Sequence, residues 1–188
     1  INKLRGVLHG TNLDEGSMFE SASKTINQSE LNTMWTQWYG DVLGSDVATK
    51  MRALYVDGRS YPTTEGYSQA WWAAEQSLTD QSFACGARST SRQLAKLGVP
   101  VYQYLFERAW ANAPVFHSAE LAYVFMNVKG RTPADVTLAQ TMASAWASMA
   151  ASGSPAISNW EKYDDTRDGP FIKFDIGALN TSTMFHKN

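Results

Sequence analysis

The sequence predicts a helix-rich α/β fold in which two strands belong to a larger, mostly parallel sheet. The apolar runs around Val7 and around Tyr102 are typical of strands that are covered on both faces. Amphipathic helical patterns fill most of the chain between and after these runs. Because two strands do not make a stable sheet by themselves, we expect the remaining strands to come from polypeptide outside this sequence.

The composition is that of a globular domain. The chain has 188 residues, of which 44% are hydrophobic and 12% aromatic, which suffices for a real core. Its formal charge is −2, and no basic stripe could neutralise a phosphate backbone, which speaks against a nucleic-acid partner. No apolar run approaches the roughly 18 residues that cross a bilayer. We therefore expect no transmembrane segment, and a start after any targeting segment.

The first elements are a strand, a loop and three helices. The strand at Val7 breaks at Gly10 and delivers the chain to a loop over residues 12–16. Ser29 is expected to cap a helix that ends near Gly40 and buries one face, made of Leu31, Met34, Trp35 and Trp38. Two more amphipathic helices are expected, preceded by the capping residues Ser45 and Thr64.

The second half predicts helix, strand and helix. Thr79 is expected to cap a helix that closes at Gly98, just before an apolar strand over residues 99–106. The best-marked helix begins with Thr132 at the N-cap, Pro133 at the first helical position and Asp135 three residues after the cap. Its apolar face runs from Leu138 to Met149, until Gly153 and Pro155 stop it. No repeat or linker divides the chain.

Two motifs identify a family. Residues 10–19 read Gly-x-x-x-Asp-Glu-Gly-x-x-Phe, and residues 115–125 surround a histidine in Phe-His-Ser-x-Glu-Leu. These segments resemble those around the triad acid and the triad histidine of the type-B carboxylesterase and cholinesterase-like family. Weaker similarities follow in the expected order at residues 80–88, 101–106 and 138–160, so the resemblance covers nearly the whole chain.

The resemblance implies one part of a catalytic domain. Residues 1–188 would form the carboxyl-terminal part of an α/β-hydrolase, whose missing amino-terminal part would supply the rest of the sheet. Residues 28–78 would be a helical gorge or cap region. Residues 79–188 would hold the last helix and strand units and the carboxyl-terminal helix.

The resemblance also assigns the catalytic side chains. Glu15 and His117 would be the acid and the base of a Ser–Glu–His triad, in which the imidazole takes the serine proton and the carboxylate fixes its tautomer. The acid precedes the histidine, as in other α/β-hydrolases, and each follows a predicted strand, where sites of open sheets assemble. Hydrolysis of a carboxylic ester or lipid by this route needs no metal and no organic cofactor.

The nucleophile is missing from this sequence. No serine has glycine two residues before and two residues after it, as a nucleophile elbow requires. The Gly-rich oxyanion-hole loop is also absent. Since both belong to the family's amino-terminal part, we expect a companion polypeptide that carries the serine, and an inactive chain without it. The alternatives are a non-catalytic cholinesterase-like binding or adhesion protein, and a stand-alone helical domain.

Other residues are secondary candidates. Glu120 and Asp14 are expected as supporting carboxylates near the triad, with a plain surface charge as the rival interpretation of Glu120. Trp72 and Phe116 are candidates for a substrate pocket, and Trp72 is expected off the buried face of its helix. His9 and His186 are interpreted as structural or exposed. A zinc site formed by His9, Glu15 and His117 lacks a supporting spacing.

Some positions depart from the family pattern or bear on the compartment. Ser118 stands where the family usually has glycine, Met149 where it has an aromatic residue, and Gly86 where proline often follows the cysteine. The disulfide partner that many relatives have for Cys85 is absent, so we expect a buried free thiol. Two candidate N-glycosylation sites, Asn27 and Asn180, favour a secreted, extracellular protein over a cytoplasmic one.

Overall fold

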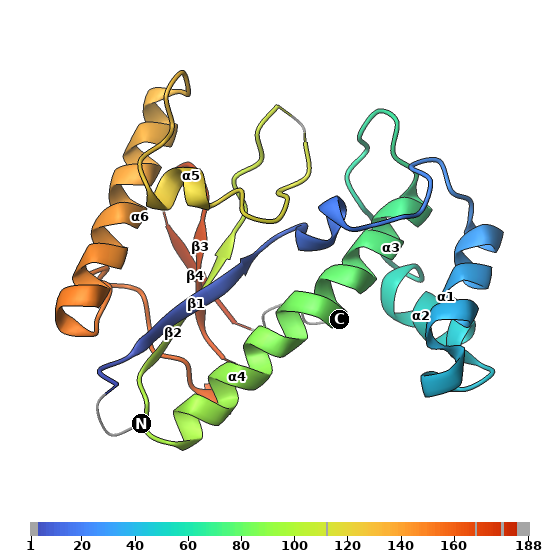
Figure 1. Cartoon of the computed structure of the whole chain (residues 1–188), viewed down its shortest axis with the longest axis horizontal. Coiled ribbons are helices and arrows are strands. Elements are labelled where there is room, and N and C mark those ends of the chain that lie inside the picture. Colours follow the sequence, from blue (N-terminus) through green and yellow to red (C-terminus); the bar gives the residue numbers. More distant parts are fainter. Residues whose placement is uncertain (1–3, 112, 168, 178, 184–188) are drawn as a thin grey trace.

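A mixed sheet lies at the centre of the computed structural model, which describes residues 4–111, 113–167, 169–177 and 179–183 (Figure 1). Within these residues the strand order is β1-β2-β3-β4. The first two pairs, β1 with β2 and β2 with β3, are parallel, and β3 pairs with β4 antiparallel. The strands are β1 (Val7–Asn12), β2 (Val101–Phe106), β3 (Phe171–Phe174) and β4 (Asn180–Ser182). The helix-rich α/β class is confirmed.

The last two strands were not predicted. β3 has four residues, with Lys173 inside its apolar run, and β4 is the polar triplet Asn-Thr-Ser. The second neighbour of β2 therefore comes from this chain, which corrects the two-strand prediction. β1 pairs only with β2 in the described part of the chain, and its first four residues are half-buried, whereas all of β2 is buried. Further strands beyond β1 stay a prediction.

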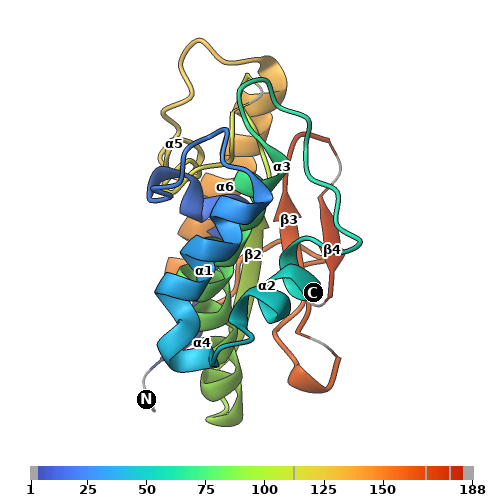
Figure 2. The same cartoon turned by 90° about the vertical axis from the view of Figure 1, so that its right-hand side faces the viewer.

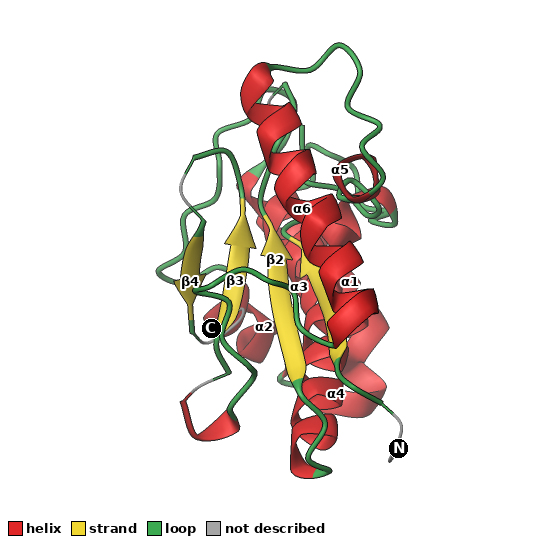
Figure 3. Cartoon of the chain, turned by 90° about the vertical axis from the view of Figure 1, so that its left-hand side faces the viewer, coloured by secondary structure: helices red, strands yellow, loops and turns green. Residues whose placement is uncertain are grey.

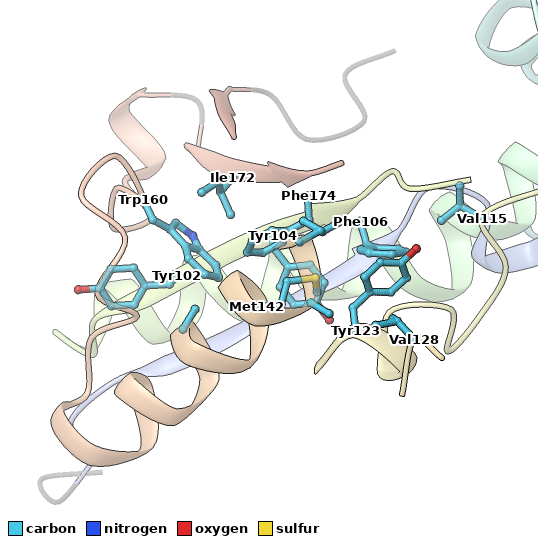
Figure 4. Close-up of a cluster of buried hydrophobic side chains, with 13 residues drawn as sticks. Tyr102, Tyr104, Phe106, Val115, Tyr123, Val128, Met142, Trp160, Ile172 and Phe174 are labelled. Carbon is cyan, nitrogen blue, oxygen red and sulfur yellow. The ribbon is translucent and has the colours of Figure 1, made fainter. Parts of the chain in front are cut away.

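Helices cover both faces of the sheet. α6 (Pro133–Ser152) lies against one face, as Figure 3 shows, and α4 (Cys85–Lys96) lies against the other. The alternation of side chains along β2 divides the core between these faces. Tyr104 and Phe106 pack with Met142 of α6 (Figure 4), while Leu105 packs with Ala84 at the start of α4.

Three helices form a second group beside the sheet, shown in Figure 2 from its outer side. They are α1 (Gln28–Leu43), α2 (Val47–Tyr55) and α3 (Gln69–Thr79). A separate cluster of buried side chains joins them, including Leu31, Trp35, Val47, Met51 and Trp71. The group lies in the predicted region 28–78, whose role as a gorge or cap stays a prediction.

The predicted starts of these helices were wrong by one to four residues. Asn27, not Ser29, caps α1. The Oδ1 of Asn27 accepts from the N–H groups of Ser29 and Glu30, and the Glu30 carboxylate accepts from the N–H of Asn27. This reciprocal arrangement satisfies more backbone donors than a single hydroxyl does. The caps of α2 and α3 are Asp46 and Ser68 rather than Ser45 and Thr64. α1 also continues past Gly40 to Leu43, before Gly44 at φ +91°.

Thr79 lies inside a helix and caps nothing. α3 continues through a π-helical segment, Asp80–Ala84, directly into α4. The Thr79 hydroxyl donates to Glu75 one turn earlier, so it serves a side chain instead of a helix start. Cys85, expected to be buried, is exposed, because this first residue of α4 lies on the outer side of the helix.

The helix predicted from Thr132 is confirmed. The Thr132 hydroxyl accepts from the N–H of Asp135, whose carboxylate accepts from the N–H of Thr132. Gly153 ends α6 at φ +79°, where a Cβ would lie 2.6 Å from the Cβ of Arg5. The remaining short elements are α5 (Leu121–Val124) and the 3-10 turns Glu15–Met18 and Asp165–Arg167. No helix within the described residues is long and apolar enough to span a membrane.

Candidate active site

Two loops at the same edge of the sheet bring Glu15 and His117 together. The acid loop (residues 13–18) follows β1, and the histidine loop (residues 113–120) follows β2 after a short connection. The imidazole Nδ1 of His117 lies 2.6 Å from Oε2 of Glu15. The histidine side chain is 43% exposed and the glutamate side chain only 7%. The acid is therefore buried behind a base that faces solvent.

Both oxygens of the Glu15 carboxylate are used. Oε1 accepts from the backbone N–H of Asn12 at 2.7 Å, and Oε2 faces the imidazole. Burial raises the pKa of Glu15 above its ordinary value, while the hydrogen bonds from Asn12 and His117 lower it. The two bonds fix the plane of the carboxylate and leave its second oxygen directed at Nδ1.

Two phenyl rings flank the imidazole of His117. The Phe19 ring meets it edge-on with centroids 5.4 Å apart, and the Phe83 ring lies tilted at 5.3 Å. The two phenyl rings also stack on each other at 5.9 Å. Within the described residues, Nδ1 is the imidazole nitrogen that is hydrogen-bonded, which leaves Nε2 available. Neither ring was predicted as a site residue: Phe19 only closes the acid motif, and Phe83 lies in a stretch that was expected to be an ordinary helix.

Asn12 connects the acid loop to the histidine loop. Its Nδ2 donates to the backbone oxygen of Phe116 at 2.9 Å and to Oε2 of Glu120 at 2.6 Å. Glu120 is half-buried, and its charge contributes to the raised pKa of Glu15. Glu120 is thus linked to the acid–base pair through Asn12, which was not among the predicted site residues, and its supporting role stays a prediction.

Asp14 contacts the histidine loop directly. Its Oδ2 accepts from the N–H of Val115 at 2.7 Å, and its own N–H donates to the Val115 oxygen at 3.1 Å. Asp14 is 8% exposed and Val115 is 2% exposed. Burial raises the pKa of Asp14 to about 6, against the lowering effect of the Val115 N–H.

A buried carboxyl supports the acid loop from α3. The N–H of Gly16 donates to Oγ1 of Thr79 at 2.8 Å, and this hydroxyl donates to Oε1 of Glu75 at 2.6 Å. A Cβ at position 16 would lie 2.8 Å from the Glu75 backbone oxygen, which explains the glycine of the motif. Burial, with the nearby charge of Asp14, raises the pKa of Glu75 well above its ordinary value.

The two candidate pocket residues do not come together. Phe116 is 42% exposed next to His117. Trp72 is 4% exposed, contrary to its expected place off the buried face, because its ring packs against Tyr67 and Trp71 in the helical group. It lies in the wall of a cavity of about 670 Å³, which is also lined by Asp14.

The remaining candidates lie elsewhere. His9 Nε2 is 2.6 Å from the Ser91 hydroxyl on the α4 side of the sheet, and burial lowers its pKa. His186 lies outside the described residues. In the described ranges no cluster of three or more His, Cys, Asp or Glu side chains could hold a metal ion. Asn27 and Asn180 are both exposed.

Ser118 has a backbone conformation that favours glycine. Its φ is +71°, a left-handed conformation that costs an L-residue roughly 1–2 kcal/mol. Ser118→Gly is expected to raise the free energy of unfolding by about 0.5–1 kcal/mol, since glycine's own entropic cost offsets part of the relief. Denaturant titration measures this change. Ser144→Gly, on the exposed side of α6, is the control and should lower stability by a similar amount; a loss in both variants would contradict the strain at Ser118.

One comparison with known protein families gives a match. A family model described as "Carboxylesterase family" matches residues 3–187, which is almost the whole chain and contains both loops. None of the curated proteins compared with the chain matches it.

Proposed function

This chain belongs to the carboxylesterase family, and on that premise we propose that it hydrolyses carboxylic esters with Glu15 as the triad acid and His117 as the triad base. The observation that carries the proposal is the 2.6 Å contact between Nδ1 and a buried carboxylate oxygen, with Nε2 left available. The serine and the oxyanion hole would come from a companion amino-terminal polypeptide. Neither a metal nor an organic cofactor takes part.

The proposed reaction proceeds through an acyl-enzyme. Nε2 of His117 accepts the serine proton as the serine oxygen attacks the ester carbonyl, and Glu15 stabilises the imidazolium that forms. The imidazolium then returns this proton to the leaving alcohol. A water molecule then loses a proton to the imidazole as its oxygen attacks the acyl carbon, and the imidazolium returns this proton to the serine oxygen as the bond to the acyl group breaks and the carboxylic acid leaves. The rings of Phe19 and Phe83 keep the imidazole in place during both proton transfers.

The surface around His117 supports a companion polypeptide. Met18 at the end of the acid loop is 60% exposed, Phe19 directly after it is 54% exposed, and Phe116 on the histidine loop is 42% exposed. Apolar side chains gathered around a half-exposed catalytic base are typical of a surface that another chain covers. β1 pairs with β2 along one edge, and its other edge faces no strand of the described residues. The backbone groups of that free edge could pair with the same partner.

Several finer features belong to the same proposal. The substrate would be a carboxylic ester or lipid, and Phe116 is the better placed of the two pocket candidates because it adjoins His117. Secretion, with glycans on Asn27 and Asn180, belongs to the same proposal, and both side chains are exposed and so accessible to glycosylation; a cytoplasmic protein is the alternative. A mass decrease after treatment of the native protein with an N-glycosidase would support secretion, and an unchanged mass would contradict glycan occupancy.

A serine-directed phosphonate tests the central proposal. We expect the native preparation to hydrolyse a p-nitrophenyl ester and to take up the label on a co-purifying polypeptide, not on this chain. The isolated chain should show neither property. Label on a serine of this chain would contradict the division of the triad. If the native preparation neither takes up the label nor hydrolyses the ester, the alternative of a non-catalytic binding or adhesion protein is favoured.

A further inference from the structure

We propose that Asp14 is a positioning residue that holds the acid loop and the histidine loop in register, a role that rests on the proposed function. Its carboxylate accepts from the Val115 N–H at 2.7 Å, and its backbone N–H donates to the Val115 oxygen at 3.1 Å. This reciprocal pair, here called the loop clamp, lies one residue before Glu15 and two residues before His117. The clamp therefore fixes both members of the acid–base pair from the backbone side.

The loop clamp sets the distance between the side chains of Glu15 and His117. The Glu15 and His117 side chains meet at 2.6 Å, and a shift of one loop along the other would separate them. Misplacement by about 1 Å can lower a catalytic rate about 10²-fold. A second connection to the histidine loop starts from Asn12, the last residue of β1, whose Nδ2 donates to the Phe116 oxygen and to Glu120. Asp14 therefore binds the histidine loop at Val115, and Asn12 binds it at Phe116 and Glu120.

An ionised Asp14 holds the Val115 N–H more strongly than a neutral acceptor does. Hydrogen bonds to an ionised acceptor are about twice as strong as neutral ones. The carboxyl groups nearest in the fold are Glu15, the next residue of the same loop, Glu75 from α3, and Glu65 and Glu107, which line the same cavity as Asp14. Glu107 is paired with Lys173 at 2.6 Å, and burial raises the pKa of Glu75 well above its ordinary value. The imidazole of His117 lies beyond Glu15.

The titration of Asp14 gives the clamp a signature. Burial raises the pKa of Asp14 to about 6. The carboxylate therefore gains a proton as the pH falls from neutral to mildly acidic. Protonation leaves a carbonyl oxygen that still accepts from Val115, but in a weaker, neutral hydrogen bond. The Val115 N–H should therefore report the ionisation of Asp14.

The kinetic test uses the complete enzyme, which is this chain with the polypeptide that carries the serine. Asp14→Ala removes the acceptor and is expected to lower kcat about 10²-fold with KM nearly unchanged. Asp14→Asn keeps an acceptor oxygen and should stay within about tenfold of the parent kcat. Asp41→Asn, the same chemical change on the exposed side of α1, is the control and should have no effect. Parent-like kcat in Asp14→Ala would overturn the clamp.

The structural test does not depend on activity. The amide resonance of Val115 should shift with pH around a midpoint of about 6 in the parent and in Asp41→Asn, and should lose this shift in Asp14→Asn. A Val115 resonance that titrates equally in Asp14→Asn would overturn the clamp, also if Asp14→Ala does not fold. If the parent hydrolyses no ester, the proposed function fails, while the Val115 titration still decides the clamp.

The same carboxylate is expected to destabilise the fold at neutral pH. The pKa of Asp14 is raised from 3.8 to about 6 by burial, so its contribution to stability is fully present below pH 3.8 and is lost as the pH rises through 6. Asp14→Asn, which stays neutral, should raise the thermal unfolding midpoint at pH 8 and change it little at pH 3.5. Equal midpoints of parent and variant at pH 8 would contradict the raised pKa.

Discussion

Replacing Glu15 by glutamine is expected to lower kcat about 10⁴-fold with no loss of fold, by analogy with the amide substitution in serine-protease triads. Oε1 of Glu15 accepts from the Asn12 N–H, so the oxygen of the glutamine amide would keep that place. Its NH₂ group would then face Nδ1 of His117 and donate to it. The imidazole would be held with its proton on Nε2, the nitrogen that must accept the serine proton.

The control for this prediction is Glu161→Gln. Glu161 pairs with Arg167 on the surface, where both side chains are well exposed, and exposed pairs contribute roughly 0–1 kcal/mol. Both variants should have the circular dichroism spectrum of the parent, and only Glu15→Gln should lose turnover of a p-nitrophenyl ester. If Glu15→Gln keeps more than about a tenth of the parent rate, the carboxylate does not orient the base.

The parts of the fold that could be predicted are those whose signals are local. The N-terminus of α6 was predicted from Thr132, Pro133 and Asp135, because a capping box is complete within four residues. β3 and β4 could not be predicted, because Lys173 interrupts one apolar run and the other strand is polar throughout. These strands form because β2 offers an edge to pair with, which is a property of the assembled sheet.

The same distinction applies to the candidate site. Glu15 and His117 were found through short motifs that resemble a known family, and the residues that arrange them were not. Asn12 and Phe83 reach the pair from a strand and from a π-helical segment, and Glu75 acts through Thr79. Thr79 was interpreted as a helix cap because a threonine before an apolar helical pattern usually has that role. The hydrogen bond from Gly16 to Thr79 joins residues that are far apart in the sequence, so no local sequence pattern predicts it.

The largest loss of stability is expected from Asp135→Ala, at about 3–5 kcal/mol. The Asp135 side chain is fully buried and accepts two hydrogen bonds from Arg108, one from the Tyr123 hydroxyl and further bonds from Thr132. Its removal leaves a guanidinium that is only 17% exposed without its counter-ion. It also uncaps α6. Denaturant unfolding at pH 7 measures this difference.

The pH dependence of this loss follows from the Arg108 guanidinium, which holds the pKa of Asp135 well below its usual range. A lowered carboxyl pKa contributes stability that is present above the unfolded pKa and is lost as the pH falls through the folded pKa. The gap between parent and Asp135→Ala should thus be widest near neutral pH and narrow in strong acid. Asp57→Ala, which removes an exposed partner of Arg52, should lower stability by less than about 1 kcal/mol. Asp135 joins α6 to α5 through the Tyr123 hydroxyl. A comparable loss of stability in both variants would mean that this buried carboxylate does not hold the two helices together.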